Sequence, residues 1–228
     1  MRTKQTLPRV AAAAAIATIA LVGLASHAHA GAIHSAVGGV INSGGPGFGD
    51  LSYTWSQAGL SAGYTSGVTD FDAYIASGPT HTVTFFPFEW FSNLGSTSAS
   101  VTYDLGSNLL LDAIALWNEE SSGIGLLDLL YSTDGTTFTP LLSGLTPTDH
   151  GLAAYAADVF SFGAVTARYI RLDMSDCPQP NVGTFAGCAI GEVAFRAADN
   201  GVPEPATMAL VGLALAGAGF ARRRMKAD

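Results

Sequence analysis

Apolar and polar side chains alternate with a period of two in the middle of this 228-residue chain. Residues 99–105 and 170–174 show the alternation, and residues 109–117 and 126–131 are short apolar runs between polar loops. Alternation of this kind is typical of strands that bury one face. Short strands separated by Gly-rich turns predict an all-β sandwich.

One turn in this region has a specific sequence signature. Ser132-Thr133-Asp134-Gly135 lies between the apolar run 126–131 and the segment Phe138 to Leu142. Asp-Gly tolerates the positive φ angles that hairpin turns require. We therefore expect the two flanking segments to pair as a hairpin.

The N-terminal segment predicts export. Arg2, Lys4 and Arg9 precede an apolar core, residues 10–25, and Ala28-His29-Ala30 offers a small-residue cleavage site. These features indicate a secretory signal peptide over residues 1–30, removed by signal peptidase after Ala30. A transmembrane helix is the alternative, but this core is shorter than the roughly 20 residues that a bilayer requires.

The C-terminal segment, residues 201–228, combines three features. It contains Pro203-Glu204-Pro205, an apolar stretch over residues 206–221, and the basic cluster Arg222, Arg223 and Arg224. The basic residues would stay on the cytoplasmic side, which places residues 31–200 across the membrane. A GPI signal is the alternative, but such signals end in an apolar tail rather than a basic one.

This tail resembles the PEP-CTERM sorting signal of exported bacterial proteins. The resemblance implies recognition by an exosortase, a membrane-embedded processing enzyme. It also implies transient insertion of the C-terminal transmembrane helix in the inner membrane, followed by transfer to the cell surface or extracellular matrix.

The segment between the two signals, residues 31–200, is long enough for one domain with its own core. It contains sixteen acidic residues, three arginines and no lysine, which is a formal charge of −13 with histidine neutral. Such a surface repels phosphate backbones, so nucleic-acid binding is not expected. Neutral sugars and divalent cations are the more compatible partners, and anionic glycans would need a bridging cation.

Cys177 and Cys188 are the two cysteines of the chain, and both lie in the exported segment. An even number of cysteines in an oxidising compartment predicts a disulfide bond. Two thiols without a nearby histidine make an incomplete zinc site.

Five short motifs between residues 99 and 196 resemble a discoidin domain, also called F5/8 type C. They are Tyr103-Asp104-Leu105-Gly106, Ala115-Leu116-Trp117-Asn118, Tyr131 to Phe138, Ala167 to Leu172, and Ile190-Gly191-Glu192-Val193. The resemblance implies a galactose-binding-like jelly roll that binds glycans, lipids or proteins through loops at one end. Residues 31–98 depart from the family pattern, so the ligand-loop positions are not transferred.

Acidic and amide side chains offer oxygen ligands at two places. Asp70 with Asp72 is one pair, and Asn118 with Glu119 and Glu120 begins a polar loop that we expect at the surface. Ca²⁺ takes six to eight oxygen ligands in flexible geometry, so a structural Ca²⁺ is the candidate cofactor. A solvated acidic loop is the alternative.

Aromatic side chains suggest a sugar-binding surface. Residues 85–91 form the densest aromatic cluster, and on a strand its alternate members would face opposite sides. We expect most of them to pack in the core and the rest to form a platform or an interface. Trp90 in this cluster and Trp55 in a polar segment are the candidate stacking residues, together with the loop residues Asn118, Glu119 and Glu120. Trp117 ends an apolar run and is expected in the core.

Gly59-Leu60-Ser61-Ala62-Gly63 fits a nucleophile elbow by composition. An elbow needs an apolar strand before it and a helix after it, and the flanking residues predict neither. The sequence therefore predicts a non-catalytic binding or matrix protein that associates with exopolysaccharide or other glycans. The alternatives are a structural biofilm or envelope protein without a ligand and, third, a secreted hydrolase.

Overall fold

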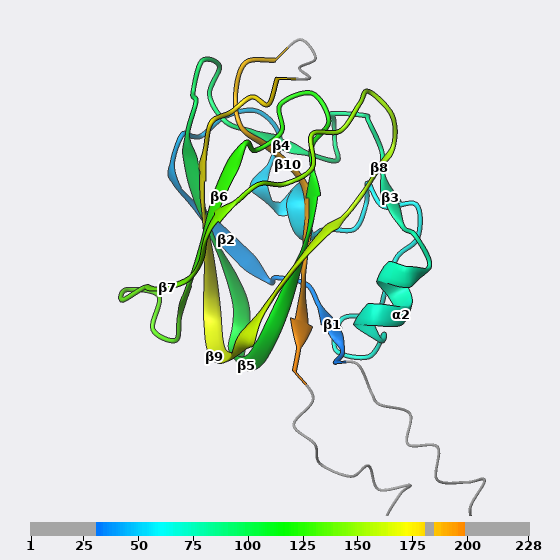
Figure 1. Ribbon diagram of the computed structural model, residues 1–228, viewed down its shortest axis with the longest axis vertical. Helices are drawn as coiled ribbons and strands as arrows, with labels where there is room; N and C mark the ends of the chain where they lie inside the picture. The colour runs from blue at the N-terminus through cyan, green and yellow to red at the C-terminus, as the bar shows by residue number, and fades with distance from the viewer. Residues whose placement is uncertain (1–30, 181–184, 199–228) are drawn as a thin grey trace, which may run out of the picture. The chain divides into compact units, whose positions relative to one another are not determined.

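Two long antiparallel strands organise the described part of the chain, which covers residues 31–180 and 185–198 of a computed structural model (Figure 1). These strands are β5 (Ala99–Asn118) and β9 (Asp158–Ser175). Their pairing is interrupted between Asp104 and Leu109, where Gly106 has a φ of +80°. A β-bulge bends a strand pair, so each strand contributes one half to each of two layers.

The remaining strands complete these layers. They are β1 (Ile33–His34), β2 (Gly38–Ser43), β4 (Trp90–Phe91), β6 (Leu126–Ser132), β7 (Thr139–Leu145) and β10 (Ala189–Ala197). One layer has the order β2-β5-β9-β6-β7. In the other, β10 pairs with the second half of β5, and β1 and β4 pair with β10. The short strands β3 (Thr80–His81) and β8 (Tyr155–Ala156) form a separate two-stranded sheet. The all-β sandwich prediction is confirmed.

The main core lies between the two layers and follows the predicted alternation. Val101 and Tyr103 of β5, Leu172 of β9, and Val193 and Phe195 of β10 are all buried in one apolar cluster. The intervening side chains of β5 and β9 in the first layer are more exposed. Burial of one face in this way contributes most of the stabilisation of such a domain.

The second layer also buries its outer face. Ala113, Ala115 and Trp117 of β5 pack against Phe71 and Tyr74 in a second apolar cluster. Phe71 and Tyr74 belong to α2 (Phe71–Ala76), a short helix beside this layer (Figure 1). The prediction that Trp117 is a core residue is confirmed. A second helical turn, η1 (Leu51–Trp55), contributes Leu51 to the main core.

The predicted cation ligands Asp70 and Asp72 have structural partners at the start of α2. Asp70 is the N-cap residue, and its carboxylate accepts a hydrogen bond of 2.7 Å from the Ala73 amide. Asp72 pairs with Arg196 at 2.8 Å, and Arg196 also contacts Asp112 at 2.7 Å. Asp70 therefore caps α2, and Asp72 joins α2 to β10 through Arg196.

The predicted hairpin is confirmed by the pairing of β6 with β7. Asp134 accepts hydrogen bonds of 2.8 Å from the amides of Thr136 and Thr137, and Gly135 has a φ of +73°. These bonds lower the pKa of the Asp134 carboxyl. The strand β7 starts at Thr139, so the connection is longer than a two-residue turn.

The predicted signal peptide with Ala28 and Ala30, and the tail with residues 203–205 and 222–224, lie outside the described residues. Within the part of the chain that the structure describes, none of the helices combines the length and hydropathy that a membrane span requires.

Candidate ligand cleft

Loops from distant parts of the sequence meet where β5 ends and where β4 and β10 begin. Ile190 of β10 pairs with Asn118 of β5 and with Trp90 of β4, which places these three strand ends side by side. A cleft of about 470 Å³ opens beside them. It is lined by Phe48, Val83, Phe85, Glu89, Phe91, Glu119, Glu120, Ser121, Leu152 and Phe185.

Three carboxyl groups lie together in this cleft. One oxygen each from Glu89, Glu119 and Glu120 lies within 4.8 Å of the other two. The residues are almost completely buried, with exposed fractions of 1%, 1% and 6%. Burying a charge is costly unless it is paired, so the partners of each carboxyl decide what the group can do.

Glu89 is positioned by two buried neighbours. The Tyr155 hydroxyl donates a hydrogen bond of 2.8 Å to Oε1 of Glu89, and Nδ1 of His81 lies 3.3 Å from the same oxygen. Nδ1 of His81 also lies 2.9 Å from the Thr82 carbonyl oxygen. Because a carbonyl oxygen only accepts hydrogen bonds, we assign the proton of the imidazole to Nδ1. Burial and the Glu89 carboxylate raise the pKa of Tyr155 well above its ordinary value, so the hydroxyl keeps its proton.

Glu119 is held by the loop that follows it. Oε1 accepts a hydrogen bond of 2.7 Å from the Ser121 hydroxyl, and Oε2 accepts one of 2.9 Å from the Ser121 amide and another from the Ser122 amide. Burial, followed by the charge of Glu120, raises the pKa of Glu119 to about 8. Burial also raises the pKa of Glu120. Both carboxyls therefore hold a proton more readily than an exposed glutamate does.

No arginine among residues 31–180 and 185–198 compensates the three carboxyls. Arg168 pairs with Asp104 at 2.9 Å and Arg171 pairs with Asp173 at 3.1 Å. Arg196 is engaged at α2, as described above. Oε2 of Glu89 and Oε2 of Glu120 are buried and have no hydrogen-bond partner among the described residues.

Phenylalanine rings form the walls of the cleft. Phe185 contacts Phe48 and Phe91 edge to face, with ring centroids 5.4 and 5.1 Å apart, and Phe85 contacts Phe91 at 5.0 Å. Phe48 is 50% exposed and Phe85 is 40% exposed. The cleft therefore places accessible ring surface next to buried carboxyl groups.

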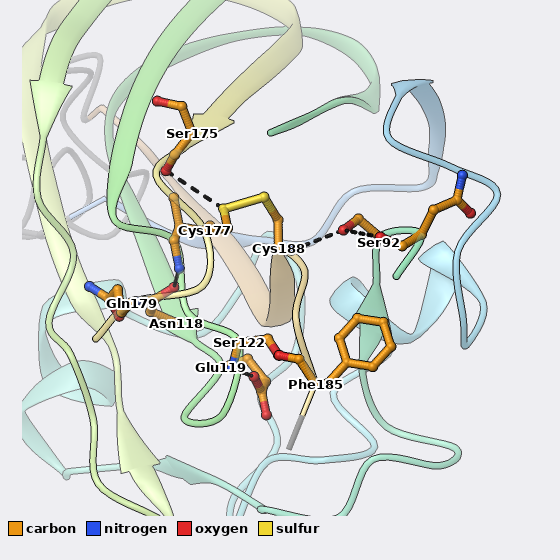
Figure 2. The surroundings of a disulfide bond; sticks show 11 residues. Ser92, Asn118, Glu119, Ser122, Ser175, Cys177, Gln179, Phe185 and Cys188 are labelled. Atoms are coloured by element: carbon orange, nitrogen blue, oxygen red, sulfur yellow. Dashed lines mark hydrogen bonds between the residues drawn. A yellow bond between two sulfur atoms is a disulfide. The ribbon is translucent and has the colours of Figure 1, made fainter. Parts of the chain in front are cut away.

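The disulfide stabilises the segment that carries Phe185. Cys177 and Cys188 are bonded, which confirms the prediction. The Ser122 hydroxyl donates a hydrogen bond of 2.6 Å to the Phe185 carbonyl oxygen, and the Cys188 amide donates one of 2.9 Å to the Ser92 hydroxyl. Figure 2 shows Glu119, Ser122 and Phe185 grouped below the disulfide.

The expectation that residues 118–123 form a surface loop is wrong, because Asn118, Glu119, Glu120 and Ser122 are buried. Asn118 uses its amide to hold the loop. It donates hydrogen bonds to the Gln179 side chain at 2.8 Å and to the Thr148 carbonyl at 2.9 Å, and it accepts one from the Ile124 amide at 2.8 Å. Asn118 thus positions Glu119 and Glu120 and does not itself line the cleft.

The two candidate tryptophans lie elsewhere. Trp90 has no exposed surface, and its indole N–H donates a hydrogen bond of 3.1 Å to the Pro46 carbonyl. Trp55 is half-buried and packs edge to face against Tyr103 with centroids 5.7 Å apart. Residues 85–89 are a turn rather than the expected strand, which begins at Trp90. The turn directs Phe85 into the cleft wall while Trp90 enters the core.

Sequence reasoning missed Glu89, Phe48, Phe185 and Leu152 as cleft residues. Only Glu89 had a local signal, as the single carboxylate within an aromatic run. Ser61 lies in a loop and accepts a hydrogen bond of 2.9 Å from the Thr80 amide, without the strand and helix of a nucleophile elbow.

A family model described as the PEP-CTERM protein-sorting motif matches residues 201–224. This match confirms the predicted sorting signal and marks the chain as an exported protein. The comparison with curated proteins finds no relative of this chain.

Solved structures similar to the chain include carbohydrate-binding modules. Chitosan-binding module 1 of a chitosanase/glucanase from Paenibacillus sp. IK-5 is 19% identical, with a TM-score of 0.47 over 71% of this chain and 95% of that one. The CBM32 of AlyQ, in complex with 4,5-unsaturated mannuronic acid, is 18% identical, with a TM-score of 0.43 over 72% and 96%. A CBM32 from Clostridium perfringens, in complex with GalNAc-β-1,3-galactose, is 19% identical, with a TM-score of 0.40 over 48% and 75%. At these levels the likeness does not extend to function.

Proposed function

We propose that this chain is an exported, non-catalytic glycan-binding protein that holds its ligand in the cleft between Phe48, Phe85 and Phe185. The observation that supports this most directly is the combination of accessible phenylalanine rings with the carboxyl groups of Glu89, Glu119 and Glu120. Ligand sites are mostly apolar, with a few polar groups that fix orientation. The apolar face of a sugar ring would lie on the phenylalanines, and its hydroxyls would form hydrogen bonds with the carboxyl groups.

The negative charge of residues 31–200 limits which glycans we expect the protein to bind. A surface with a strong negative charge disfavours polyanions, so neutral or amine-bearing sugars would bind directly. Exopolysaccharide outside the producing cell is the ligand we propose, reached after signal peptidase and exosortase have processed the two ends. The PEP-CTERM match supports this route, and the cleft supports the type of ligand.

The test is retention of the full-length protein on insoluble glycans, including the exopolysaccharide of the producing organism. The protein is purified in a polyoxyethylene detergent, which carries no sugar. We expect retention to fall about tenfold in Phe85→Ala, because a stacking ring contributes on the order of 1 kcal/mol or more. Val68→Ala is the matched control, since Val68 is a 75% exposed apolar residue that does not line the cleft.

The alternatives are outcomes of the same assay. Retention on none of the glycans tested would reject the proposal in favour of a matrix or envelope protein without a sugar ligand. Release of new reducing ends from a retained glycan, lost in Glu119→Gln, would show a hydrolase instead.

A further inference from the structure

We propose that Glu89, Glu119 and Glu120 bind one divalent cation, Ca²⁺, at the floor of the aromatic cleft. The site draws on the turn before β4 and the loop after β5, so it forms only when these segments are folded together. It is distinct from the Asp70 and Asp72 pair, which caps α2 and binds Arg196.

The spacing of the carboxyl oxygens fits Ca²⁺. Calcium–oxygen distances are about 2.3–2.6 Å, so two oxygens bound to one ion are at most about 5 Å apart. The three ligand atoms lie within 4.8 Å of one another, which is inside that span. A Mg²⁺ ion holds its oxygens at about 2.1 Å and requires near-ideal octahedral geometry. Three buried side chains from two segments meet this requirement less easily than the flexible geometry of Ca²⁺.

Two buried oxygens lack partners in this group. Oε2 of Glu89 and Oε2 of Glu120 accept no hydrogen bond from a described residue. Both residues are more than nine-tenths buried, with exposed fractions of 1% and 6%. The described arginines are paired with other carboxylates. A bound cation would satisfy these oxygens and offset the repulsion among the carboxylates.

The available ligand atoms are oxygens. Nδ1 of His81 is engaged with Glu89, Tyr155 and Thr82. Its Nε2 lies so close to Gly59 that a Cβ atom added to Gly59 would be 2.1 Å from this nitrogen. Both cysteines are in the disulfide. Carboxylate oxygens without nitrogen or sulfur favour Ca²⁺ or Mg²⁺ over Zn²⁺ and Cu²⁺.

The surrounding side chains already orient two of the three ligands. Tyr155 and His81 fix Glu89 through Oε1, which leaves Oε2 for the ion. Ser121 and the Ser122 amide fix Glu119. Outer partners of this kind hold metal ligands in place and raise affinity.

The remaining coordination positions would face the cleft, which Phe85 and Leu152 also line. Water fills such positions in the absence of a ligand. If the cleft binds a glycan as proposed above, sugar oxygens could replace this water, and an acidic sugar could then bind despite the charge of the chain. This consequence rests on the proposed function, but the cation site does not.

The test is calorimetric titration of the full-length protein with CaCl₂, without glycan, after treatment with EDTA. We expect one site per chain with a dissociation constant on the order of 0.1–1 mM, the range of extracellular calcium modules. Glu89→Gln and Glu120→Gln should each weaken binding at least about tenfold. Asp70→Asn is the matched control and should bind as the parent does, because asparagine also caps helices.

Circular dichroism and the melting temperature without calcium show whether each variant is folded. We expect both variants to fold, because a neutral glutamine removes charge repulsion from the carboxyl cluster when no ion is bound. No saturable heat up to 10 mM CaCl₂, or equal binding by the parent and Glu120→Gln, would overturn the proposal. Equal affinity for MgCl₂ would overturn the assignment to Ca²⁺. Calcium binding without retention on any glycan would leave this site standing and reject the glycan function alone.

Discussion

Tyr155 donates a hydrogen bond of 2.8 Å to Glu89 although 66 positions separate the two residues. The bond connects β8 to the turn before β4, and Nδ1 of His81 lies 3.0 Å from the Tyr155 oxygen. All three side chains are buried. Because β3 carries His81 and pairs with β8, the small two-stranded sheet fixes the position of one cleft carboxyl.

Tyr155→Phe removes this hydroxyl and leaves Oε1 of Glu89 without its hydrogen-bond donor, because the Nδ1 proton of His81 points to the Thr82 carbonyl. An unsatisfied buried acceptor costs about 1–3 kcal/mol, so we expect the free energy of unfolding to fall by that amount at pH 7. Urea denaturation followed by tryptophan fluorescence measures the change. Tyr131→Phe serves as the control, since the Tyr131 hydroxyl makes no hydrogen bond to a described residue and its removal should change stability by less than about 0.5 kcal/mol.

Glu192→Gln should stabilise the protein in a pH-dependent manner. Burial raises the pKa of Glu192 well above its ordinary value of 4.5, so the folded state keeps a proton that the unfolded state releases above that pH. The stability linked to this proton is fully present below pH 4.5 and is lost as the pH rises. We therefore expect the variant to exceed the parent by about 1–3 kcal/mol at pH 8 and to approach it near pH 4.5.

The measurement is urea unfolding of both proteins in EDTA between pH 4.5 and 8. Burial lowers the pKa values of His34 and His150. Their contribution to the free energy of unfolding therefore increases as the pH rises through the ordinary histidine range, opposite to the contribution of Glu192. The difference between variant and parent removes this shared contribution. A difference that stays constant across the pH range would contradict the role assigned to Glu192.

Loss of the disulfide should destabilise the fold and the cleft together. In the chain-entropy model, a bond across a separation of 11 residues contributes about 2–3 kcal/mol. We expect the Cys177→Ala and Cys188→Ala double variant to lose that amount in urea denaturation. It should also bind glycan less well than the parent under native conditions, because the segment with Phe185 is released. Unchanged retention would show that Phe185 does not need this constraint.

The strands could be predicted because one face of each is buried. Val101, Tyr103 and Leu172 alternate with more exposed neighbours, and that pattern follows from the sandwich itself. That residues 99–118 form one strand was not predicted, because the two halves of β5 belong to different layers and the bulge after Asp104 interrupts the alternation of apolar and polar side chains. The six-residue helix α2 is too short for helical periodicity to reveal it.

The cleft could be predicted only in part. Glu119 and Glu120 were candidates, but local polarity placed them at the surface, whereas Asn118, Gln179 and the disulfide segment bury them. These partners are about 60 residues away in the sequence, beyond the reach of local reasoning. Glu89 was not predicted because an aromatic run surrounds it and only the tertiary fold brings it to Glu119.

Glu204→Ala tests the sorting signal, which the family model matches over residues 201–224. If recognition requires the Pro-Glu-Pro motif, the variant should keep its C-terminal segment and accumulate in the inner-membrane fraction, whereas the parent reaches the cell surface or medium. Cell fractionation followed by immunoblotting and intact-mass analysis measures both properties. Asp228→Ala, an acidic residue outside the match, should be exported normally. Export of Glu204→Ala at the parental level, with the same processed mass, would show that the carboxylate is not part of the recognised signal.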